Sequence, residues 1–130
     1  MSARKWIRER IKASTELMAL VAGGVYDGVA PKGSPYPNID LTRVSRIQTE
    51  NAFADRLRDN DLWRIRYIDK SISAAKADSA GEIIQSLFHK VHDEANDIIA
   101  STFEQSRQFT QVEDGEIYQI YIVDIRVETR

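Results

Sequence analysis

Apolar side chains recur at helical spacing over the first twenty residues of the chain. When these residues are placed at about 100° per residue, one side of the segment is apolar and the other is basic. The apolar side carries Trp6, Ile7, Ile11, Leu17 and Met18. Ser14 interrupts the pattern and can cap a second, shorter helix with Glu16 in its first turn. The pattern predicts two short helices between Ala3 and Leu20, ended by Gly23 and Gly24.

The next segments predict strands joined by a proline-rich connector. Val25 to Pro31 has the composition of a short strand that runs into a turn, and the prolines of Lys32 to Pro37 favour a rigid, extended connector. Apolar and polar residues then alternate over Asn38 to Val44, which predicts a half-buried strand. Arg46 to Asp61 is polar and charged, and we expect it to form a long hairpin excursion or a loop.

The second half of the chain predicts three further strands and one long helix. Leu62 to Ile68 alternates between an apolar face and an arginine face, as a strand does. Ser73 to Asp93 carries an apolar stripe at helical spacing, with small residues in its first half that would let the helix sit close on a sheet. The stripe contains Ala77, Ala80, Gly81, Ile84, Leu87, Phe88 and Val91. Ile98 to Phe109 and Ile117 to Val127 follow as strands, joined by a hairpin turn at Glu113 to Gly115.

These elements, in the order α-β-β-β-α-β-β, predict an α+β fold within a single domain, residues 1–130. We expect a mixed or antiparallel sheet of about four to five strands, packed against the N-terminal helix and the one long helix. The last strand is apolar on both faces near its middle, which favours a central position in the sheet. The residues expected in the core are Ile11, Leu41, Trp63, Ile65, Ile84, Leu87, Phe88, Tyr121 and Val123.

Charge and composition exclude several classes of function. The formal net charge is −2, whereas a dedicated nucleic-acid binder is usually strongly basic. The chain has no cysteine, so disulfides, thiolate catalysis and Cys-type zinc sites are absent. No apolar run approaches the roughly 18 residues of a membrane span, and the N-terminus does not have the pattern of a secretory signal, so we expect no membrane partner.

No group of residues has the pattern of a catalytic, cofactor or metal site. His89 and His92 lie three apart on the predicted helix, but a metal site needs three or four convergent ligands, and solvated helix residues are the simpler interpretation. The glycines around Gly28 match neither phosphate-loop motif and are better explained as turns. The carboxylates of the central segment alternate with arginines, as in a solvated surface or a charge-matched interface. No serine nucleophile motif is present, so we expect a protein that is not an enzyme.

The basic side of the first helix is the strongest indication of nucleic-acid binding. It carries Arg4, Lys5, Arg8 and Lys12, whereas Arg10 falls on the apolar side. Clustered positive charge attracts phosphates, but no aromatic residue is interleaved with this stripe. Three interpretations therefore stay open: an ordinary solvated helix face, a contact between subunits, and a small nucleic-acid-binding module.

The segment VYDGVAPKGSPYP, Val25 to Pro37, and the strand sequence IDLTRVS that follows resemble the tail-completion (tail-terminator) proteins of long-tailed bacteriophages. The later elements agree with that family in their order. They are a tryptophan-bearing strand at Leu62 to Tyr67, an alanine-rich start to the helix Ala74 to Val91, and a closing hairpin that ends in the arginine-containing strand Ile122 to Val127. The resemblance covers nearly the whole chain and concerns turns and core positions.

This resemblance implies a ring, typically a hexamer, on the head-proximal end of the phage tail tube. Such a ring stops polymerisation of the tube, contacts the major tail tube protein and offers a docking surface to the head–tail connector or neck protein. DNA and the tape-measure protein would pass through its lumen. It also implies a structural virion protein assembled in the cytoplasm of the host bacterium. A head-completion or neck connector protein of similar size is the alternative within the same class.

A ring of heterologous contacts needs two different complementary surfaces on each subunit. The chain offers three charged candidates: the basic first helix, the arginine- and aspartate-rich central segment, and the acidic hairpin. The predicted interface residues are Arg4, Lys5, Arg8, Arg56, Arg58, Asp59, Asp61, Glu113, Asp114 and Glu116. We expect deletion of Glu50 to Asn60 to leave the fold intact and impair assembly. We also expect a weakly charged or acidic lumen, past which DNA slides, because phosphate contacts dominate affinity for DNA.

Overall fold

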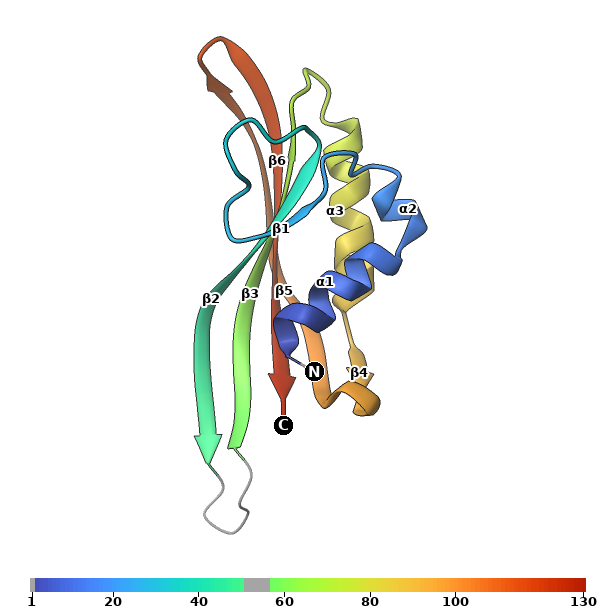
Figure 1. Ribbon diagram of the computed structural model, residues 1–130, viewed down its shortest axis with the longest axis vertical. Helices are drawn as coiled ribbons and strands as arrows, with labels where there is room; N and C mark the ends of the chain where they lie inside the picture. The colour runs from blue at the N-terminus through green and yellow to red at the C-terminus, as the bar shows by residue number, and fades with distance from the viewer. Residues whose placement is uncertain (1, 51–56) are drawn as a thin grey trace.

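A computed structural model describes residues 2–50 and 57–130 of the chain (Figure 1). Three α-helices, six strands and one 3₁₀ helix lie in these residues. They are α1 (Ala3–Ala13), α2 (Thr15–Met18), β1 (Val25–Asp27), β2 (Asn38–Glu50), β3 (Leu57–Asp69), α3 (Ala75–Phe88), β4 (Val91–Asp93), η1 (Glu94–Asn96), β5 (Ile98–Glu113) and β6 (Glu116–Thr129). The described strands form one sheet in the order β1-β2-β3-β6-β5-β4, so the predicted α+β fold is confirmed.

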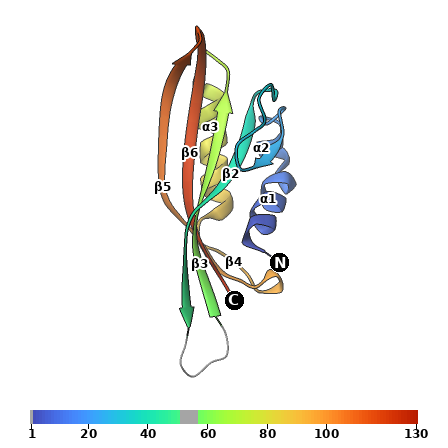
Figure 2. The same cartoon turned by 60° about the vertical axis from the view of Figure 1, so that its left-hand side comes forward.

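The sheet is antiparallel except at one edge, where β1 runs parallel to β2. Strand β6 lies between β3 and β5, which confirms the central position expected from its apolar middle. The three helices cover one face of the sheet, and none of residues 2–50 and 57–130 forms a helix on the other face (Figure 2). The long β2–β3 and β5–β6 hairpins extend from opposite ends of the sheet (Figure 1).

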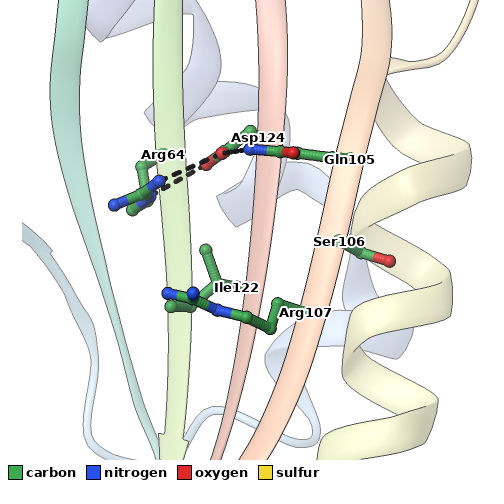
Figure 3. A pocket seen from close by; sticks show the side chains of 6 residues that line it. All are labelled: Arg64, Gln105, Ser106, Arg107, Ile122 and Asp124. Carbon is green, nitrogen blue, oxygen red and sulfur yellow. Dashed lines mark hydrogen bonds and ion pairs between the residues drawn. The ribbon is translucent and has the colours of Figure 1, made fainter.

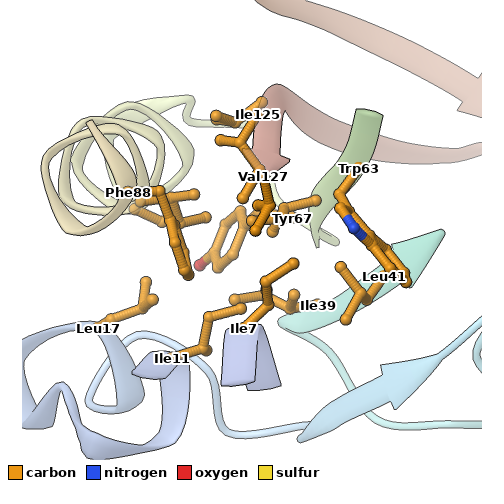
Figure 4. Close-up of a cluster of buried hydrophobic side chains, with 14 of the residues drawn as sticks. Ile7, Ile11, Leu17, Ile39, Leu41, Trp63, Tyr67, Phe88, Ile125 and Val127 are labelled. Atoms are coloured by element: carbon orange, nitrogen blue, oxygen red, sulfur yellow. The ribbon is translucent and has the colours of Figure 1, made fainter. Parts of the chain in front are cut away.

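The core lies between the helices and the sheet (Figure 4). Alternation places one set of strand side chains on the helix-covered face, where they meet the apolar sides of the helices. The largest fully buried side chains are Trp63, Tyr67, Phe88, Ile7, Ile11, Leu17, Ile39, Leu41, Ile65, Ile84, Ile98 and Ile125. Of the nine residues expected in the core, seven are buried, whereas Leu87 and Tyr121 are half-buried and pack against its margin.

The two N-terminal helices form as predicted. The side-chain oxygen of Ser14 accepts a hydrogen bond from the Leu17 amide and caps α2, which has Glu16 in its first turn. Arg10, which sequence periodicity placed on the apolar side, lies with its guanidinium 5.6 Å from the Trp6 ring centroid and donates to the backbone carbonyl of Leu87. This cation therefore spans the junction between α1 and α3.

The proline-rich connector is held against the end of α2 through Gly23. The Gly23 amide donates to the carbonyl of Pro37 over 2.7 Å, and a Cβ at Gly23 would overlap the carbonyl of Pro35. The side-chain amide of Asn38 donates to the same Pro35 carbonyl over 3.1 Å. The Tyr26 hydroxyl donates to the carbonyl of Gly23 over 2.7 Å. These contacts account for the ordered path of a segment that has little regular secondary structure.

The prediction that the main helix runs to Asp93 is wrong. Helix α3 ends at Phe88, His89 has extended backbone, and Val91–Asp93 is strand β4. The short strand pairs with β5, and its Asp93 carboxylate accepts a hydrogen bond from the Trp6 indole over 3.1 Å. These tertiary contacts override the helical period of Val91. Within the described residues the sheet consequently has six strands, and neither His89 nor His92 lies on a helix.

The central charged segment is mostly sheet. Strand β2 continues to Glu50 and β3 begins at Leu57, so the hairpin interpretation is confirmed for the described residues and a loop is not found there. A register shift near Val44 marks a bulge in β2. Arg56 and most of the segment proposed for deletion lie outside the described residues. Asp59 and Asn60, however, pair with Thr129 and Glu128 of β6, so deletion through Asn60 would also remove part of the sheet.

The last hairpin closes through a two-residue turn. Asp114 and Gly115 have φ of 50° and 77°, the left-handed backbone of a tight antiparallel hairpin. Glu113 and Glu116 pair across the turn. The predicted turn is confirmed, and β5 extends four residues beyond the expected end at Phe109. Within residues 2–50 and 57–130, no helix has the length and apolar character needed to cross a membrane.

Candidate interaction surface

The sheet face without helices carries arginine–carboxylate pairs between neighbouring strands. Arg64 of β3 holds both carboxylate oxygens of Asp124 on β6, at 2.9 and 3.1 Å. Arg66, two residues further along β3, reaches across to β2 and donates to Asp40 over 2.6 Å. Both carboxylates are buried, although no helix covers them. The planar guanidinium groups supply the two parallel hydrogen bonds and cover the carboxylates from solvent.

The two buried carboxylates differ in their pKa. Burial raises the pKa of Asp124, but hydrogen bonds from Arg64 and Gln105 and the charges of Arg64 and Arg107 outweigh it, so the net pKa is lowered. Burial also raises the pKa of Asp40, and the hydrogen bond and charge of Arg66 do not fully offset it. The difference follows from the number of donors around each carboxylate.

A hollow of about 170 Å³ lies beside Asp124 (Figure 3). Its lining residues are Arg64, Gln105, Ser106, Arg107, Ile122 and Asp124. Arg107 extends from β5 across the face of β6 beside Ile122. The one carboxylate that lines the hollow, Asp124, already accepts hydrogen bonds from Arg64 and from the Gln105 side chain, the latter over 2.7 Å. The hollow therefore presents cationic and amide groups, with no free acid or base positioned for proton transfer. Among the described residues, no group of three or more metal-ligating side chains is found.

A second hollow, of about 420 Å³, lies between the proline-rich connector and the β5–β6 hairpin. The rings of Tyr36 and Tyr118, which both line it, contact each other at a tilted angle with centroids 5.4 Å apart. The predicted interface residues Glu113 and Asp114 line its outer end. The segment that carries the family resemblance therefore forms one wall of a depression next to the acidic hairpin.

The basic residues of the first helix are placed on the surface and most have partners. Arg8 forms an ion pair with Asp27 at 2.9 Å, and Lys5 lies 3.9 Å from Glu9. The guanidinium of Arg4 lies 5.3 Å from the centroid of the Trp63 ring. Because these contacts engage much of the positive charge, the helix presents less free charge to a polyanion than its sequence indicates.

The predicted interface residues of the central hairpin have different surroundings. Asp61 is buried, and Arg46 binds both of its carboxylate oxygens at 2.9 and 3.0 Å. Asp59 lies 3.8 Å from the same arginine. Arg58 is exposed and lies 3.7 Å from Glu128 of β6. Asp61 therefore has a structural contact within its own chain, whereas Arg58 is available to a neighbouring molecule.

The candidate residues do not converge on one site. Glu113 and Asp114 are exposed at one end of the sheet, and Glu116 forms an ion pair with Lys70 at 3.5 Å. Arg58 and Asp59 lie toward the other end, where the β2–β3 hairpin extends, and the first helix lies between the two on the covered face (Figure 1). The surfaces are separate, as two different interfaces require.

Sequence reasoning missed the open edges of the sheet. Strand β1 pairs with β2 only as far as Leu41, and β4 pairs with β5 only as far as Ser101. The remaining lengths of β2 and β5 carry four exposed large apolar side chains: Val44, Ile47, Phe109 and Val112. These edges become visible only when the strand order is known, because the sequence does not state which strands are neighbours.

Comparison with known proteins shows the fold. No protein-family model matches the chain, and no curated protein sequence matches it. A chain of a solved structure described as the virion of a native gene transfer agent (GTA) particle is similar to this chain, with a TM-score of 0.63 and 19% sequence identity. The similarity covers 94% of this chain and 91% of that chain.

Proposed function

We propose that this chain is a structural protein of a phage-like virion, and that within the virion it is a ring-forming tail terminator. It would cap the head-proximal end of the tail tube, stop tube polymerisation and join the tail to the head connector. The observation that carries the proposal is the similarity to a chain of the GTA virion over nearly the full length of both chains. The VYDGVAPKGSPYP segment gives the narrower assignment, because it resembles the tail-completion family.

The polar groups of the open sheet face support a structural role. Asp40 and Asp124 are each bound by an arginine, so neither carboxylate is free to act on a substrate. Catalysis by carboxylates needs groups with free lone pairs next to a substrate cleft. The hollow beside Asp124 is small and its acid is already occupied.

The distribution of charge supports a subunit that contacts more than one partner. The acidic hairpin and the hairpin that carries Arg58 lie at opposite ends of the sheet. In the tail-completion family the ring is typically a hexamer. In such a ring these two ends would contact the major tail tube protein and the connector or neck protein. The proposal does not fix which end meets which partner.

Passage of DNA and the tape-measure protein through the lumen requires a wall to which DNA does not bind. The net charge of −2 and the pairing of Arg64 and Arg66 with carboxylates are consistent with such a wall. Paired arginines release few counterions from DNA, and counterion release supplies most non-specific affinity. A ring in which Arg4, Lys5 and Arg8 all line the lumen would contradict this part of the proposal.

The test is an early stop codon in this gene in its phage or phage-like element, followed by negative-stain electron microscopy of the lysate. A tail terminator predicts overlong, unattached tubes beside filled heads. Supplying the intact gene from a plasmid should restore tails of normal length. This control separates loss of the protein from an effect on neighbouring genes.

The other outcomes reassign the protein. Free tails of normal length would indicate a head-completion or neck connector protein that acts after termination. Intact, infectious particles would contradict a virion role and favour a nucleic-acid-binding module. That module would show DNA binding that weakens steeply as salt rises, whereas a flat response would exclude it.

A further inference from the structure

Two long strand edges are open in the described part of the chain. The edge of β5 is unpaired from Thr102 to Glu113, beyond the end of β4. The edge of β2 is unpaired from Thr42 to Glu50, beyond the end of β1. At about 3.3 Å per residue, the β5 edge is about 40 Å long. Each edge presents a row of backbone N–H and C=O groups that can pair with another strand.

These edges carry charged residues and one bulge each, but they lack the two residue types that most often protect an exposed strand. Neither open length contains a proline or a lysine. Of the seven large apolar side chains that are exposed in the described residues, four lie on the two edges: Val44 and Ile47 on β2, and Phe109 and Val112 on β5. Exposed apolar residues on an open edge indicate a surface that is covered in the assembled state.

An open groove lies beside the beginning of the free β5 edge. It has a volume of about 320 Å³ and is lined by Glu82, Gln85, Ser86, His89 and Phe103. Phe103 lies two residues beyond Ser101, the partner of Val91 at the start of β4, so a strand placed beside this part of β5 would continue the line of β4. The Phe103 amide already points to this side, because it donates to the Nδ1 atom of His89 over 3.3 Å.

The backbone groups available along the β5 edge follow from the hairpin register. Glu113 and Glu116 flank a two-residue turn and form a hydrogen-bonded pair. Alternate residues of β5, starting with the one directly before Glu113, therefore direct their N–H and C=O groups away from β6. Counted back from the turn, these residues are Val112, Thr110, Gln108 and Ser106.

We propose that the open edge of β5 in one copy pairs with the open edge of β2 in the next copy, which continues the sheet from subunit to subunit. This inference rests on the ring proposed above and names its contact. Along the sheet, β2 and β5 run in opposite directions, because three antiparallel pairings separate them. Two copies in the same orientation therefore bring these edges together as an antiparallel pair, the heterologous contact that a ring requires.

The offset between the two edges fits ring closure. The position of each edge can be referred to β6 by following the strand pairs. Arg46 on the open part of β2 pairs with Asp61, which pairs with Val127 of β6. Gln108 on the open part of β5 pairs with Tyr121 of β6. The two edges are thus displaced by about six residues, or about 20 Å, along the strands. Strands β2, β3, β6 and β5, together with the gap to the next copy, give a repeat of about 19 Å across the sheet. If the copies close into a ring with no rise from one copy to the next, this offset for each repeat requires the strands to tilt by about 45° from the ring axis. Strands in closed barrels tilt by roughly 35–45°.

Charge also favours the pairing of unlike edges. The open part of β2 carries two arginines, Arg43 and Arg46, and one glutamate at its end, whereas the open part of β5 carries two glutamates and one arginine. Pairing β2 with β2 would place arginines opposite one another, and like charges directly opposite destabilise a strand pair. Pairing β2 with β5 places the arginine-rich edge beside the edge that carries the glutamates.

The absence of cysteine from the chain allows a direct test by disulfide trapping. One set of variants carries a single cysteine on β5, Gln108→Cys or Thr110→Cys, and a second set carries one on β2, Ser45→Cys or Ile47→Cys. The sets are oxidised separately and as mixtures, both as concentrated purified protein and in particles assembled in the host. Ser79→Cys, on the exposed side of α3, is the control for random collision.

The proposal predicts covalent dimers in the mixtures of β5 and β2 variants and little dimer in either set alone. A chain that carries both cysteines should form a ladder of oligomers. Dimers within one set alone would indicate an isologous contact and overturn the proposal. Crosslinks to the tube protein, or the absence of β5–β2 crosslinks from both purified protein and particles, would also overturn it.

A proline variant tests whether backbone pairing holds the copies together. Gln108→Pro removes an N–H that points away from β6, so the internal ladder of the hairpin stays intact. We expect this variant to keep the circular-dichroism spectrum and melting temperature of Gln108→Ala and to lose assembly. An assembled Gln108→Pro ring would contradict the proposal.

The contact and the proposed function can fail separately. Overlong tubes in the stop-codon lysate without β5–β2 crosslinks would leave the terminator role in place and remove this contact. Crosslinks together with normal-length tails would leave the contact in place and remove the terminator role.

Discussion

The ring of Tyr121 on β6 occupies the space into which a side chain at Gly81 of α3 would project. A Cβ at Gly81 would overlap three atoms of that ring. The Tyr121 hydroxyl accepts a hydrogen bond from the Gln85 side chain over 2.7 Å, which holds the ring beneath the helix. Ala77 and Ala80 are also fully buried on this side of α3. The helix can therefore lie close to the central strand of the sheet.

Replacing Gly81 should change stability in opposite directions in two backgrounds. In the natural chain, Gly81→Ala should lower the free energy of unfolding by about 1–3 kcal/mol, because the added methyl group overpacks the contact with Tyr121. In a Tyr121→Ala background the space is open, and the same change should raise stability by up to about 1 kcal/mol through helix propensity. Urea denaturation of the four proteins measures the cycle. The same sign in both backgrounds would contradict the close contact.

Phe88 and Leu87 should differ in their contribution to stability, although both lie on the predicted apolar stripe. Phe88 is fully buried and meets the Trp6 ring edge-on, with centroids 5.8 Å apart, whereas Leu87 is half-buried. We expect Phe88→Ala to cost about 3–5 kcal/mol, the usual range for a buried aromatic side chain. Leu87→Ala should cost clearly less, because the cavity it leaves is open to solvent. Thermal or urea unfolding would show the order, and equal losses would contradict it.

Local patterns in the sequence predicted the elements that depend on local interactions. Ser14 as a helix cap, the turn at Asp114 and Gly115, and the alternation around Ile65 each involve residues close in sequence. The end of α3 could not be predicted in this way, because Val91 continues the helical period. Its position in β4 is decided by pairing with β5, a contact between segments brought together by the fold.

The candidate surface shows the same division. Alternation correctly placed Arg64 and Arg66 on the face opposite Ile65, but it could not identify their partners. Arg64 pairs with Asp124, sixty residues away, because β6 lies beside β3 in the sheet. The sequence likewise gave equal weight to Asp61 and Arg58 as interface residues, whereas the fold buries the first and exposes the second.

Replacing Asp124 by asparagine should alter the pH dependence of stability. The folded pKa of Asp124 is lowered, so its carboxylate stabilises the fold above the unfolded pKa of about 3.9, and this contribution is lost as pH falls through the folded pKa. The stability difference between the natural chain and Asp124→Asn should therefore shrink as pH falls from about 5 to about 3. Urea denaturation across this range measures the difference.

Asp40→Asn is the matched control for this experiment, since it changes a buried carboxylate of the same face. The folded pKa of Asp40 is raised, so its titration favours the folded state at low pH, and that advantage is lost as pH rises through the folded pKa. The free energy of unfolding of the natural chain minus that of Asp40→Asn should therefore fall as pH rises. If the two stability differences changed with pH in the same direction, the hydrogen bonds and burial described for one of the two carboxylates would be contradicted.

Asp61 and Arg58 should separate stability from assembly on the β2–β3 hairpin. Asp61→Asn removes the charge held by Arg46 at a buried position, and we expect it to lower the free energy of unfolding by about 1–3 kcal/mol. Arg58→Ala breaks an exposed ion pair with Glu128 and should change stability by no more than about 0.5 kcal/mol.

If Arg58 contacts a neighbouring subunit or the tube, this variant should still impair assembly when it replaces the natural protein in the phage. Tail length by electron microscopy and urea denaturation of the purified variants give the two readouts. Normal tails with Arg58→Ala would remove Arg58 from the interface, whereas a neutral Asp61→Asn would show that its pairing with Arg46 is dispensable for the fold.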